Sequence, residues 1–462
     1  MLANRIALAS TRNSTEQANS FGSAGFEVSS EAKRKVRTDS LRIAFFVGSF
    51  PTVSETFIVD QAAGLLQRKH NVLIFALHPG DTTVLQPKVE AFRLTERVQL
   101  ISVPTVLVRR LTRLARGVAL FLRYKPRAFL RLIRKTLNSN GSSWSERLRS
   151  VIQVFYFAPY FVKQPAFDVI HCHFAQVGIF VESLRRAGVI SGPLITTAHG
   201  VDVTAHTRYH GLEAFTPLFR NSEAVTCSSS YMARVLEHCG CPRNKIVRFK
   251  LGIELGAFPP RPPLQRSTDF RILTVARLTE KKGHKYSIAA MTKLRLKYPS
   301  FHYFIVGDGT LREELEQQIK ELDLASHVSL LGWRTGESLR QLYNEADVFL
   351  LSSVRSSQGD TEGQGLVLQE AQAIGMPIVC TDHNGFSEGI VPEVSGYLVP
   401  EYDSDAIAEK LDEVLRNPEF RRSAAVAGRQ FVEAEYDLDR RNDCLVKLYA
   451  IVRSGTTLPD RL

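Results

Sequence analysis

Short apolar segments alternate with longer mixed segments along most of the chain. The first apolar segment covers residues 42–47 (R-I-A-F-F-V), and it precedes a predicted loop at 48–51, a predicted helix at 55–69 and a second strand at 71–77. Similar strands are predicted at 169–173, 194–198 and 224–228. Strands that alternate with helices are typical of a parallel, doubly wound sheet.

A proline-rich stretch at 256–264 interrupts this alternation, which then starts again. Strands are predicted at 271–276, 302–306, 328–331, 348–352 and 377–381, with helices after Gly283 and at 366–374, 404–416 and 421–435. We therefore expect an α/β protein with two Rossmann-like halves that face each other across a ligand-binding cleft. The expected organisation is a disordered extension (1–40), an N-terminal domain (41–255), a linker (256–268), a C-terminal domain (269–436), and a helix that returns to the first domain, followed by a tail (437–462).

Composition limits the location and the partners of the chain. Its formal net charge of +12 indicates an anionic partner, but no nucleic-acid reader motif is visible. Six cysteines in 462 residues are too sparse for a disulfide framework, which favours reduced thiols and a cytoplasmic location. The first forty residues lack the apolar run of a signal peptide, and no uncharged apolar run of about 18 residues predicts a transmembrane helix.

Residues 105–150 form a basic amphipathic segment. Leu107, Leu111, Leu114, Val118 and Phe121 recur at helical spacing. Cations crowd the same segment, at Arg109, Arg110, Arg113, Arg116, Arg123, Lys125, Arg127, Arg131, Arg134 and Lys135. Such a helix suits an anionic membrane surface, and it equally suits a solvated helix whose apolar stripe packs on the first domain. The two interpretations are compatible.

Two glutamates mark a candidate binding site in the sequence D-T-E-G-Q-G-L-V-L-Q-E-A at 360–371. Glu362 is predicted in a loop, between Gly359 on one side and Gly363 and Gly365 on the other, while Glu370 is predicted within the helix that begins near Leu366. Two carboxylates at a helix start can bind two sets of hydroxyls, and the helix N-terminus can seat a phosphate between them. This is the layout of a nucleotide sugar.

Two cations follow a predicted strand in V-A-R-L-T-E-K-K-G at 275–283. Arg277 and Lys282 there suit a diphosphate, because arginine can bind phosphate oxygens bidentately and lysine supplies a point charge. The alternative is that both are surface charges on a loop.

Other candidate side chains have simpler explanations. His171 and His173 share one face of a strand, as a metal pair would, but a structural or acceptor-side role is favoured. Cys239 and Cys241 lack a second ligand pair, so no metal site is predicted. Glu55 could cap its own helix or contact an acceptor.

Together these motifs resemble the retaining glycosyltransferases of family 4, which have the GT-B fold. The resemblance rests on the two motifs above, on A-D-V-F-L-L-S-S at 346–353, and on G-S-F-P-T-V-S-E-T-F-I at 48–58, D-V-I-H-C-H-F at 168–174 and A-H-G-V-D at 198–202. It extends over about residues 41–449, and it is most similar to the branch that makes bacterial exopolysaccharides such as colanic acid and amylovoran.

The resemblance implies a role for each matching residue. Arg277 and Lys282 would hold the donor diphosphate, Glu370 the ribose hydroxyls and Glu362 the hydroxyls of the transferred sugar. His199 would meet the sugar near its 6-hydroxyl, and Gly48 would let the backbone approach the donor. Backbone groups at Gly363, Gly365, Leu366, Asn384 and Gly385 would add contacts to the donor, and Glu55 and His173 would lie on the acceptor side.

It also implies a hexosyltransferase that needs no metal or other cofactor. The expected partners are a nucleotide sugar, with UDP favoured over GDP, a glycan or lipid-linked acceptor, and the cytoplasmic face of the inner membrane as a peripheral site. The alternatives are a nucleotide-sugar epimerase and an inactive basic scaffold.

The chain also departs from the family. K-L-G-I-E stands at 250–254 where many relatives have P-x-G-x-D, and Gln364 and Gly365 replace commoner residues after E-G. Since Gln364 and Gly365 are expected beside the donor sugar, they leave the sugar preference open.

Overall fold

The computed structural model describes residues 40–52, 55–81, 86–102, 106–137, 144–200, 202–204, 207, 211–262, 264 and 268–462. The expected N-terminal extension, apart from Ser40, lies outside the described residues, as do residues 263 and 265–267 of the expected linker.

Among the described residues, the N-terminal half is built on a parallel sheet of seven strands, in the order β3-β2-β1-β4-β5-β6-β7. The strands are β1 (Arg42–Phe50), β2 (Asn71–Pro79), β3 (Val98–Leu100), β4 (Val169–His173), β5 (Leu194–Ala198), β6 (Ala224–Cys227) and β7 (Ile246–Arg248). β1 runs through Gly48 to Phe50, so the predicted loop at 48–51 is wrong for its first three residues.

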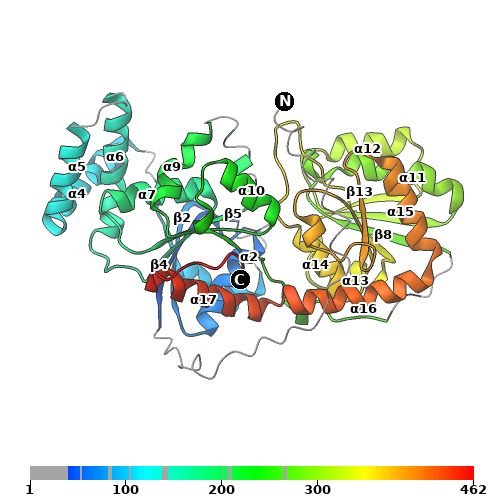
Figure 1. Cartoon of the computed structure of the whole chain (residues 1–462). Helices are drawn as coiled ribbons and strands as arrows, with labels where there is room; N and C mark the ends of the chain where they lie inside the picture. The colour runs from blue at the N-terminus through cyan, green and yellow to red at the C-terminus, as the bar shows by residue number, and fades with distance from the viewer. Residues whose placement is uncertain are drawn as a thin grey trace, which may run out of the picture. The chain divides into compact units, whose positions relative to one another are not determined.

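Alternate residues of these strands face two different layers of helices. Phe46 and Ile170 join one core with α7 (Ala175–Arg186) and α9 (Thr216–Asn221), whereas Phe45 and Val47 join another with α2 (Thr56–Gln67). The second core also contains apolar residues of α17 (Leu438–Ser454), the C-terminal helix, which packs against α2 (Figure 1). Burial of both faces explains why these strands read as nearly continuous apolar runs.

The C-terminal half contains the second parallel sheet, whose described strands follow the order β10-β9-β8-β11-β12-β13. They are β8 (Phe270–Val275), β9 (Phe301–Val306), β10 (Val328–Gly332), β11 (Val348–Leu351), β12 (Ile378–Thr381) and β13 (Gly396–Val399). Its helices are α11 (His284–Lys297), α12 (Arg312–Glu321), α13 (Gly336–Glu345), α14 (Leu366–Ile374), α15 (Ser404–Arg416) and α16 (Pro418–Glu435). The predicted fold class, two doubly wound parallel sheets, is confirmed.

Three helices beside the N-terminal sheet carry most of the basic segment, namely α4 (Leu107–Tyr124), α5 (Pro126–Leu137) and α6 (Trp144–Phe161) (Figure 1). α4 crosses α6 closely at Gly117, where an added Cβ would lie 1.9 Å from the carbonyl oxygen of Phe155. Leu114 and Val118 pack against the core, and Phe121 is buried in it. The later part of the amphipathic stripe, from Leu114 to Phe121, therefore packs on the first half, as one of the two interpretations expects, whereas Leu107 and Leu111 stay exposed.

Candidate active site

The strand-to-helix turn after β8 places three cations together. Arg277 is exposed, whereas Lys281 and Lys282 are buried in a short 3-10 helix at Glu280–Lys282. Gly283 ends this turn with φ +64°, and an added Cβ would lie 1.9 Å from the carbonyl oxygen of Ser352. Only glycine fits this position, because the turn lies directly against the end of β11.

Glu362 lies opposite these lysines. Its two carboxylate oxygens are 3.1 Å from Lys281 Nζ and 3.0 Å from Lys282 Nζ, and Lys281 also pairs with Asp360 at 3.2 Å. Burial would raise the pKa of Glu362, but the two ammonium groups outweigh it and hold that pKa far below its ordinary value. The structure therefore brings the predicted residues Lys282 and Glu362 together, and it adds Lys281, for which the only sequence signal was the K-K pair.

The backbone of Glu362 is held by two side chains that follow β12. Its N–H donates to His383 Nε2 at 3.1 Å, and its carbonyl accepts from Asn384 Nδ2 at 2.9 Å. His383 is in turn oriented by Glu401, whose oxygen lies 2.6 Å from Nδ1. The Asn384 side chain thus supports the glutamate loop, a role that the sequence did not indicate.

Glu370 occupies the helix α14, which begins at Leu366 as predicted. Gly365 precedes the helix with φ +69°, a left-handed conformation that favours glycine. A Glu370 oxygen accepts a hydrogen bond from the Tyr343 hydroxyl at 2.8 Å. Burial raises the pKa of Glu370 to about 7, so this carboxylate is poised to ionise near neutral pH.

His199 is held on the N-terminal half by a buried carboxylate. Asp202 accepts hydrogen bonds from the backbone N–H groups of His199 (2.9 Å), Gly200 (2.8 Å) and Ala175 (2.8 Å). The half-buried ring packs against Phe57 and Phe174, and the centroid of each lies 4.6 Å from its own. Its backbone meets the loop at 360–365 that contains Glu362, called the donor loop from here on, since an added Cβ on Gly363 would lie 2.4 Å from the His199 carbonyl oxygen.

Three further predicted residues have different surroundings. An added Cβ on Gly48 would meet no atom within 4 Å, so space remains next to the backbone there. Glu55 precedes α2 without capping it, which excludes the capping interpretation in this structure, and the charge of Arg277 acts on its carboxylate. Burial raises the pKa of Glu55. His173 is fully buried, which agrees with the structural role proposed as one alternative for it, and its acceptor-side role stays a prediction.

The interpretation of His171 and of the cysteines as structural residues agrees with their contacts. The two ring nitrogens of His171 bond Tyr449 Oη and Thr197 Oγ1, both at 2.7 Å. All six cysteines are free thiols, and five of them are buried. In the part of the chain that the structure describes, no group of three or more His, Cys, Asp or Glu side chains could hold a metal ion.

The side chain of Gln364 is bonded to the N-terminal half. Its amide forms two hydrogen bonds with the backbone of Leu251, accepting from the N–H and donating to the carbonyl, each at 2.9 Å. Both residues are buried, so the side chain ties the donor loop to the segment that follows β7. The Gln364 amide is thus occupied by the backbone of Leu251, and the place of this segment beside the donor sugar stays a prediction.

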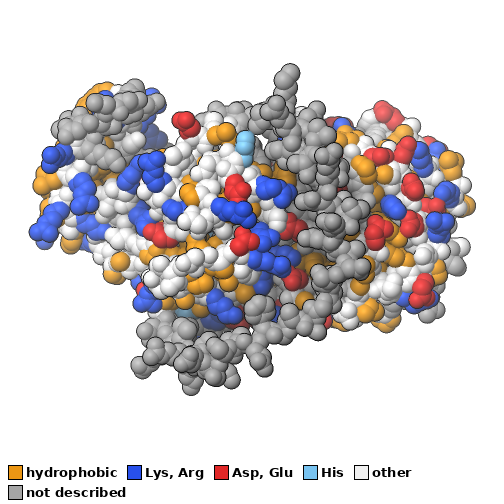
Figure 2. All heavy atoms as spheres, in the orientation of Figure 1, with side chains coloured by type: hydrophobic (Ala, Val, Ile, Leu, Met, Phe, Trp, Pro, Cys, Tyr) orange, Lys and Arg blue, Asp and Glu red, His pale blue; other side chains and the backbone are white. Residues whose placement is uncertain are grey.

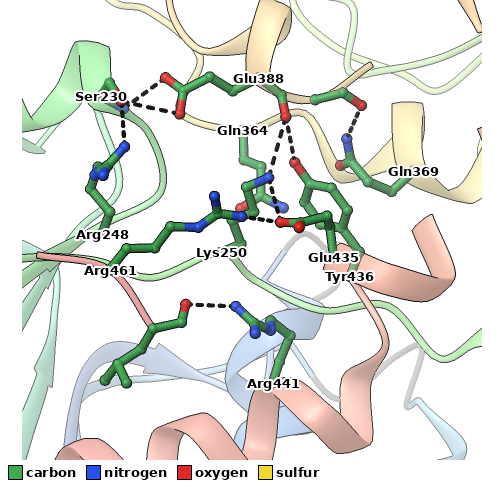
Figure 3. A network of polar contacts seen from close by, with 12 residues as sticks. Ser230, Arg248, Lys250, Gln364, Gln369, Glu388, Glu435, Tyr436, Arg441 and Arg461 are labelled. Carbon is green, nitrogen blue, oxygen red and sulfur yellow. Dashed lines mark hydrogen bonds and ion pairs between the residues drawn. The ribbon is translucent and has the colours of Figure 1, made fainter. Parts of the chain in front are cut away.

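A polar network beside Gln364 makes further connections between the two halves (Figure 3). The carboxylate of Glu388 accepts from Ser230 N at 2.7 Å and from its hydroxyl at 3.3 Å, at the start of α10 (Ser230–His238). The Glu388 carbonyl accepts from Lys250 Nζ (3.4 Å) and from Tyr436 Oη (3.0 Å), and Lys250 also pairs with Glu435. These contacts join the turn that contains Glu388 to the N-terminal half.

Comparison with known proteins agrees with this geometry. The family model of the group 1 glycosyl transferases matches residues 260–431, and that of glycosyltransferase family 4 matches residues 54–256. WcaL of Escherichia coli K12, a glycosyltransferase assigned to colanic acid biosynthesis, is 32% identical over 380 residues, which cover 80% of this chain and 90% of WcaL. The amylovoran biosynthesis glycosyltransferase AmsK of Erwinia amylovora is 31% identical over 403 residues, covering 86% of this chain and 96% of AmsK.

Solved structures show the same fold at lower identity. Sucrose-phosphate synthase of Thermosynechococcus elongatus has a TM-score of 0.66 and 20% identity, covering 90% of this chain and 99% of that one. Anabaena HepE, solved in complex with UDP, has a TM-score of 0.65 and 17% identity, with coverage of 89% and 100%. The fold and the sequence relatives agree, and the chain therefore belongs to glycosyltransferase family 4, with the GT-B fold.

Proposed function

We propose that this chain is a retaining, metal-independent hexosyltransferase of exopolysaccharide biosynthesis, which moves a sugar from a UDP-sugar to a glycan acceptor. One observation carries the proposal, namely the buried pair of Lys282 and Glu362 directly beside the start of α14. The cation can bind a diphosphate, the carboxylate can bind sugar hydroxyls, and the helix N-terminus attracts the charge between them. The names of WcaL and AmsK support the exopolysaccharide pathway.

The chemistry would follow from where charge develops. As the bond between the sugar and the diphosphate breaks, negative charge collects on the leaving phosphate, where Arg277, Lys281 and Lys282 can stabilise it. The acceptor hydroxyl would attack the oxocarbenium-like sugar from the same face, and a phosphate oxygen would take its proton. Glu370 would bind the ribose and His199 the sugar, and no protein nucleophile is required.

UDP is the favoured nucleotide because HepE, which shares the fold, was solved with UDP and with UDP-glucose. Thermal-shift assays with UDP-, GDP- and ADP-glucose test this preference. A ligand at 100 times its dissociation constant adds about 2.7 kcal/mol to the free energy of unfolding. A response to another nucleotide but not to UDP would overturn the assignment of the base.

Single substitutions test the site itself. Lys282→Ala and Glu370→Ala should each lower transfer about a hundredfold, since each removes a charged group that holds the donor. Lys320→Ala is a matched control, because Lys320 is an exposed lysine on α12 of the same half. Wild-type rates from either site variant would refute the assignment.

An assay without acceptor separates the alternatives. An epimerase would isomerise a UDP-sugar in the absence of acceptor, whereas the proposed transferase would leave the sugar unchanged or hydrolyse it slowly. A chain that binds the nucleotide sugar but transfers it to no lipid-linked or free glycan would instead support the inactive scaffold.

We also propose that helices α4 and α5 attach the protein to an anionic membrane surface, where a lipid-linked acceptor would be found. Large apolar side chains are exposed around them at Val106, Leu107, Val108, Leu111, Leu122, Tyr124, Leu130, Trp144 and Leu148. Leu107 retains 68% and Leu130 64% of its surface. Basic side chains gather over the same helices (Figure 2). No helix among the described residues is long and apolar enough to span a bilayer.

The pattern on α4 supports this attachment. At about 100° per residue, Val108, Leu111 and Leu122 project within about 60° of one another, and exposed Arg109 and Arg116 lie beside them. An apolar strip bordered by arginines on its solvent-facing side matches an interfacial helix, with the apolar side chains in the acyl boundary and the guanidinium groups at the lipid phosphates.

Charge reversal tests the membrane surface without touching the core. Arg109→Glu with Arg116→Glu should weaken binding to phosphatidylglycerol vesicles at least about tenfold, because each basic residue near such a surface contributes about 1 kcal/mol. Lys285→Glu with Lys320→Glu reverses two exposed lysines of the C-terminal half and serves as the control. Equal binding by the two double variants would contradict the proposal.

A further inference from the structure

Three imidazole rings stand in a row behind the donor loop. The ring centroids of His171 and His173 are 4.6 Å apart, and those of His173 and His199 are 5.6 Å apart with planes only 22° from parallel. His173 Nδ1 lies 3.4 Å from His199 Nε2 in hydrogen-bonding geometry. The buried ring of His173 therefore contacts His199, whose backbone lies next to the donor loop.

Burial favours the neutral form of all three rings. Burial lowers the pKa of His171 and of His199 to about 3, and burial lowers that of His173 well below its ordinary value. A neutral imidazole carries one N–H and one lone pair, so each ring must be in one of two tautomers. The hydrogen bond between His173 and His199 then requires one nitrogen to donate and the other to accept.

The other nitrogen of His173 decides between the two arrangements. His173 Nε2 is buried and has no hydrogen-bond partner among the described residues. If this nitrogen carried the proton, a donor would be left unpaired in the core, and orphaned buried N–H groups are rarer than orphaned acceptors. The proton therefore belongs on His173 Nδ1, from which it is donated to His199 Nε2.

We propose that His173 is a positioning residue that fixes His199 as the Nδ1–H tautomer, so that His199 presents an N–H donor to an oxygen of the bound sugar nucleotide. His199 Nδ1 is free for this contact, because it has no hydrogen bond to any described residue. The role of the ligand rests on the proposed function, whereas the tautomer does not. Phe57 and Phe174 both pack closely against the ring, which restricts the rotation that would exchange its nitrogens.

Nitrogen NMR of the histidine rings tests the tautomer in the ligand-free full-length chain. Long-range proton–nitrogen spectra distinguish the N–H nitrogen from the bare one, and single histidine variants assign the signals. The wild type should show His199 and His173 both protonated at Nδ1. A bare Nδ1 on His199 would overturn the proposal, whether or not the protein proves to bind a nucleotide sugar.

Two variants of His173 separate positioning from packing. His173→Leu removes the donor, so His199 should move its proton to Nε2 or show both tautomers. His173→Asn places an amide N–H near the position of Nδ1, and it should restore the wild-type spectrum. Tyr449→Phe is the control, since it removes a hydrogen bond from His171 in the same core and should leave the His199 signals unchanged.

Rates with the nucleotide sugar that binds in the thermal-shift screen complete the test. His173→Leu should lower the release of nucleoside diphosphate about tenfold, which corresponds to one lost hydrogen bond to the ligand, and His173→Asn should recover most of the loss. A His173→Leu protein that keeps the wild-type tautomer or the wild-type rate would overturn the positioning role. Should His173→Leu fail to fold, the wild-type spectrum still decides the tautomer.

Discussion

Replacing Gln364 with methionine should destabilise the protein without changing its sugar preference. Methionine has nearly the same length and fills the same space, but it cannot pair with the backbone of Leu251. The substitution leaves one buried N–H and one buried carbonyl without their partners, and each costs about 1 to 3 kcal/mol. Because Leu251 is only 7% exposed, water can relieve little of this, and we expect a loss of about 2 to 6 kcal/mol in the free energy of unfolding.

Urea denaturation followed by far-UV circular dichroism measures this loss. Gln317→Met is the matched control, because Gln317 lies on α12 and bonds only an exposed glutamate one turn away. Its effect should stay below about 0.5 kcal/mol. The same Gln364→Met protein is then ranked against a panel of UDP-sugars. Unchanged stability together with a new sugar ranking would refute the reasoning and return Gln364 to the sugar site.

Three other substitutions probe the elements around the site. Glu370→Gln should gain stability relative to the wild type as the pH rises from about 5 to 8. In the folded wild type the pKa of Glu370 is about 7, above its ordinary 4.5, so the wild type loses stability as Glu370 ionises. The difference should reach up to about 3 kcal/mol. Equal pH profiles in thermal unfolding would contradict this. Asp202→Asn should lower the free energy of unfolding by about 1 to 3 kcal/mol, because an amide N–H group would replace one of the two oxygens that accept from backbone N–H groups. An unchanged midpoint of urea denaturation would contradict this. Gly117→Ala should cost about 1 to 3 kcal/mol by forcing α4 away from α6, and a neutral result would show that the crossing is looser than the structure has it.

Elements with a strong local pattern were predictable from the sequence. The apolar runs at 169–173 and 194–198 match β4 and β5, and the helix predicted at 366–374 matches α14. The short strands β3, β7 and β13 were missed, because three or four residues give few positions for a pattern, although the four-residue strands β6, β11 and β12 were predicted. Similarly, one amphipathic period at 105–150 could not show that the segment divides at Pro126 into separate helices.

The candidate site was predictable in its parts but not in its pairings. A residue such as Lys282 could be assigned a charge and a position after a strand, because both depend on local sequence. Its pairing with Glu362, eighty residues later, depends on the register of two parallel strands and their turns, which no local pattern specifies. The same holds for Gln364, whose partner is the backbone of a residue on the other half.

Two glycines, Gly363 in the donor loop and Gly385 in the turn after β12, show why contacts between distant segments matter for the site. The sequence assigned Gly363 and Gly385 to the donor, and that role stays a prediction, but each also touches the N-terminal half. An added Cβ on Gly363 would lie 2.4 Å from the His199 carbonyl oxygen, and one on Gly385 would lie 2.5 Å from Ser229 Cβ. Neither glycine has a positive φ, so close approach and not backbone conformation is what a side chain would disturb. An alanine at Gly363 would therefore push its loop away from the turn that carries His199, and an alanine at Gly385 would push its turn away from Ser229 at the start of α10. Both effects would occur even if neither glycine touches a phosphate.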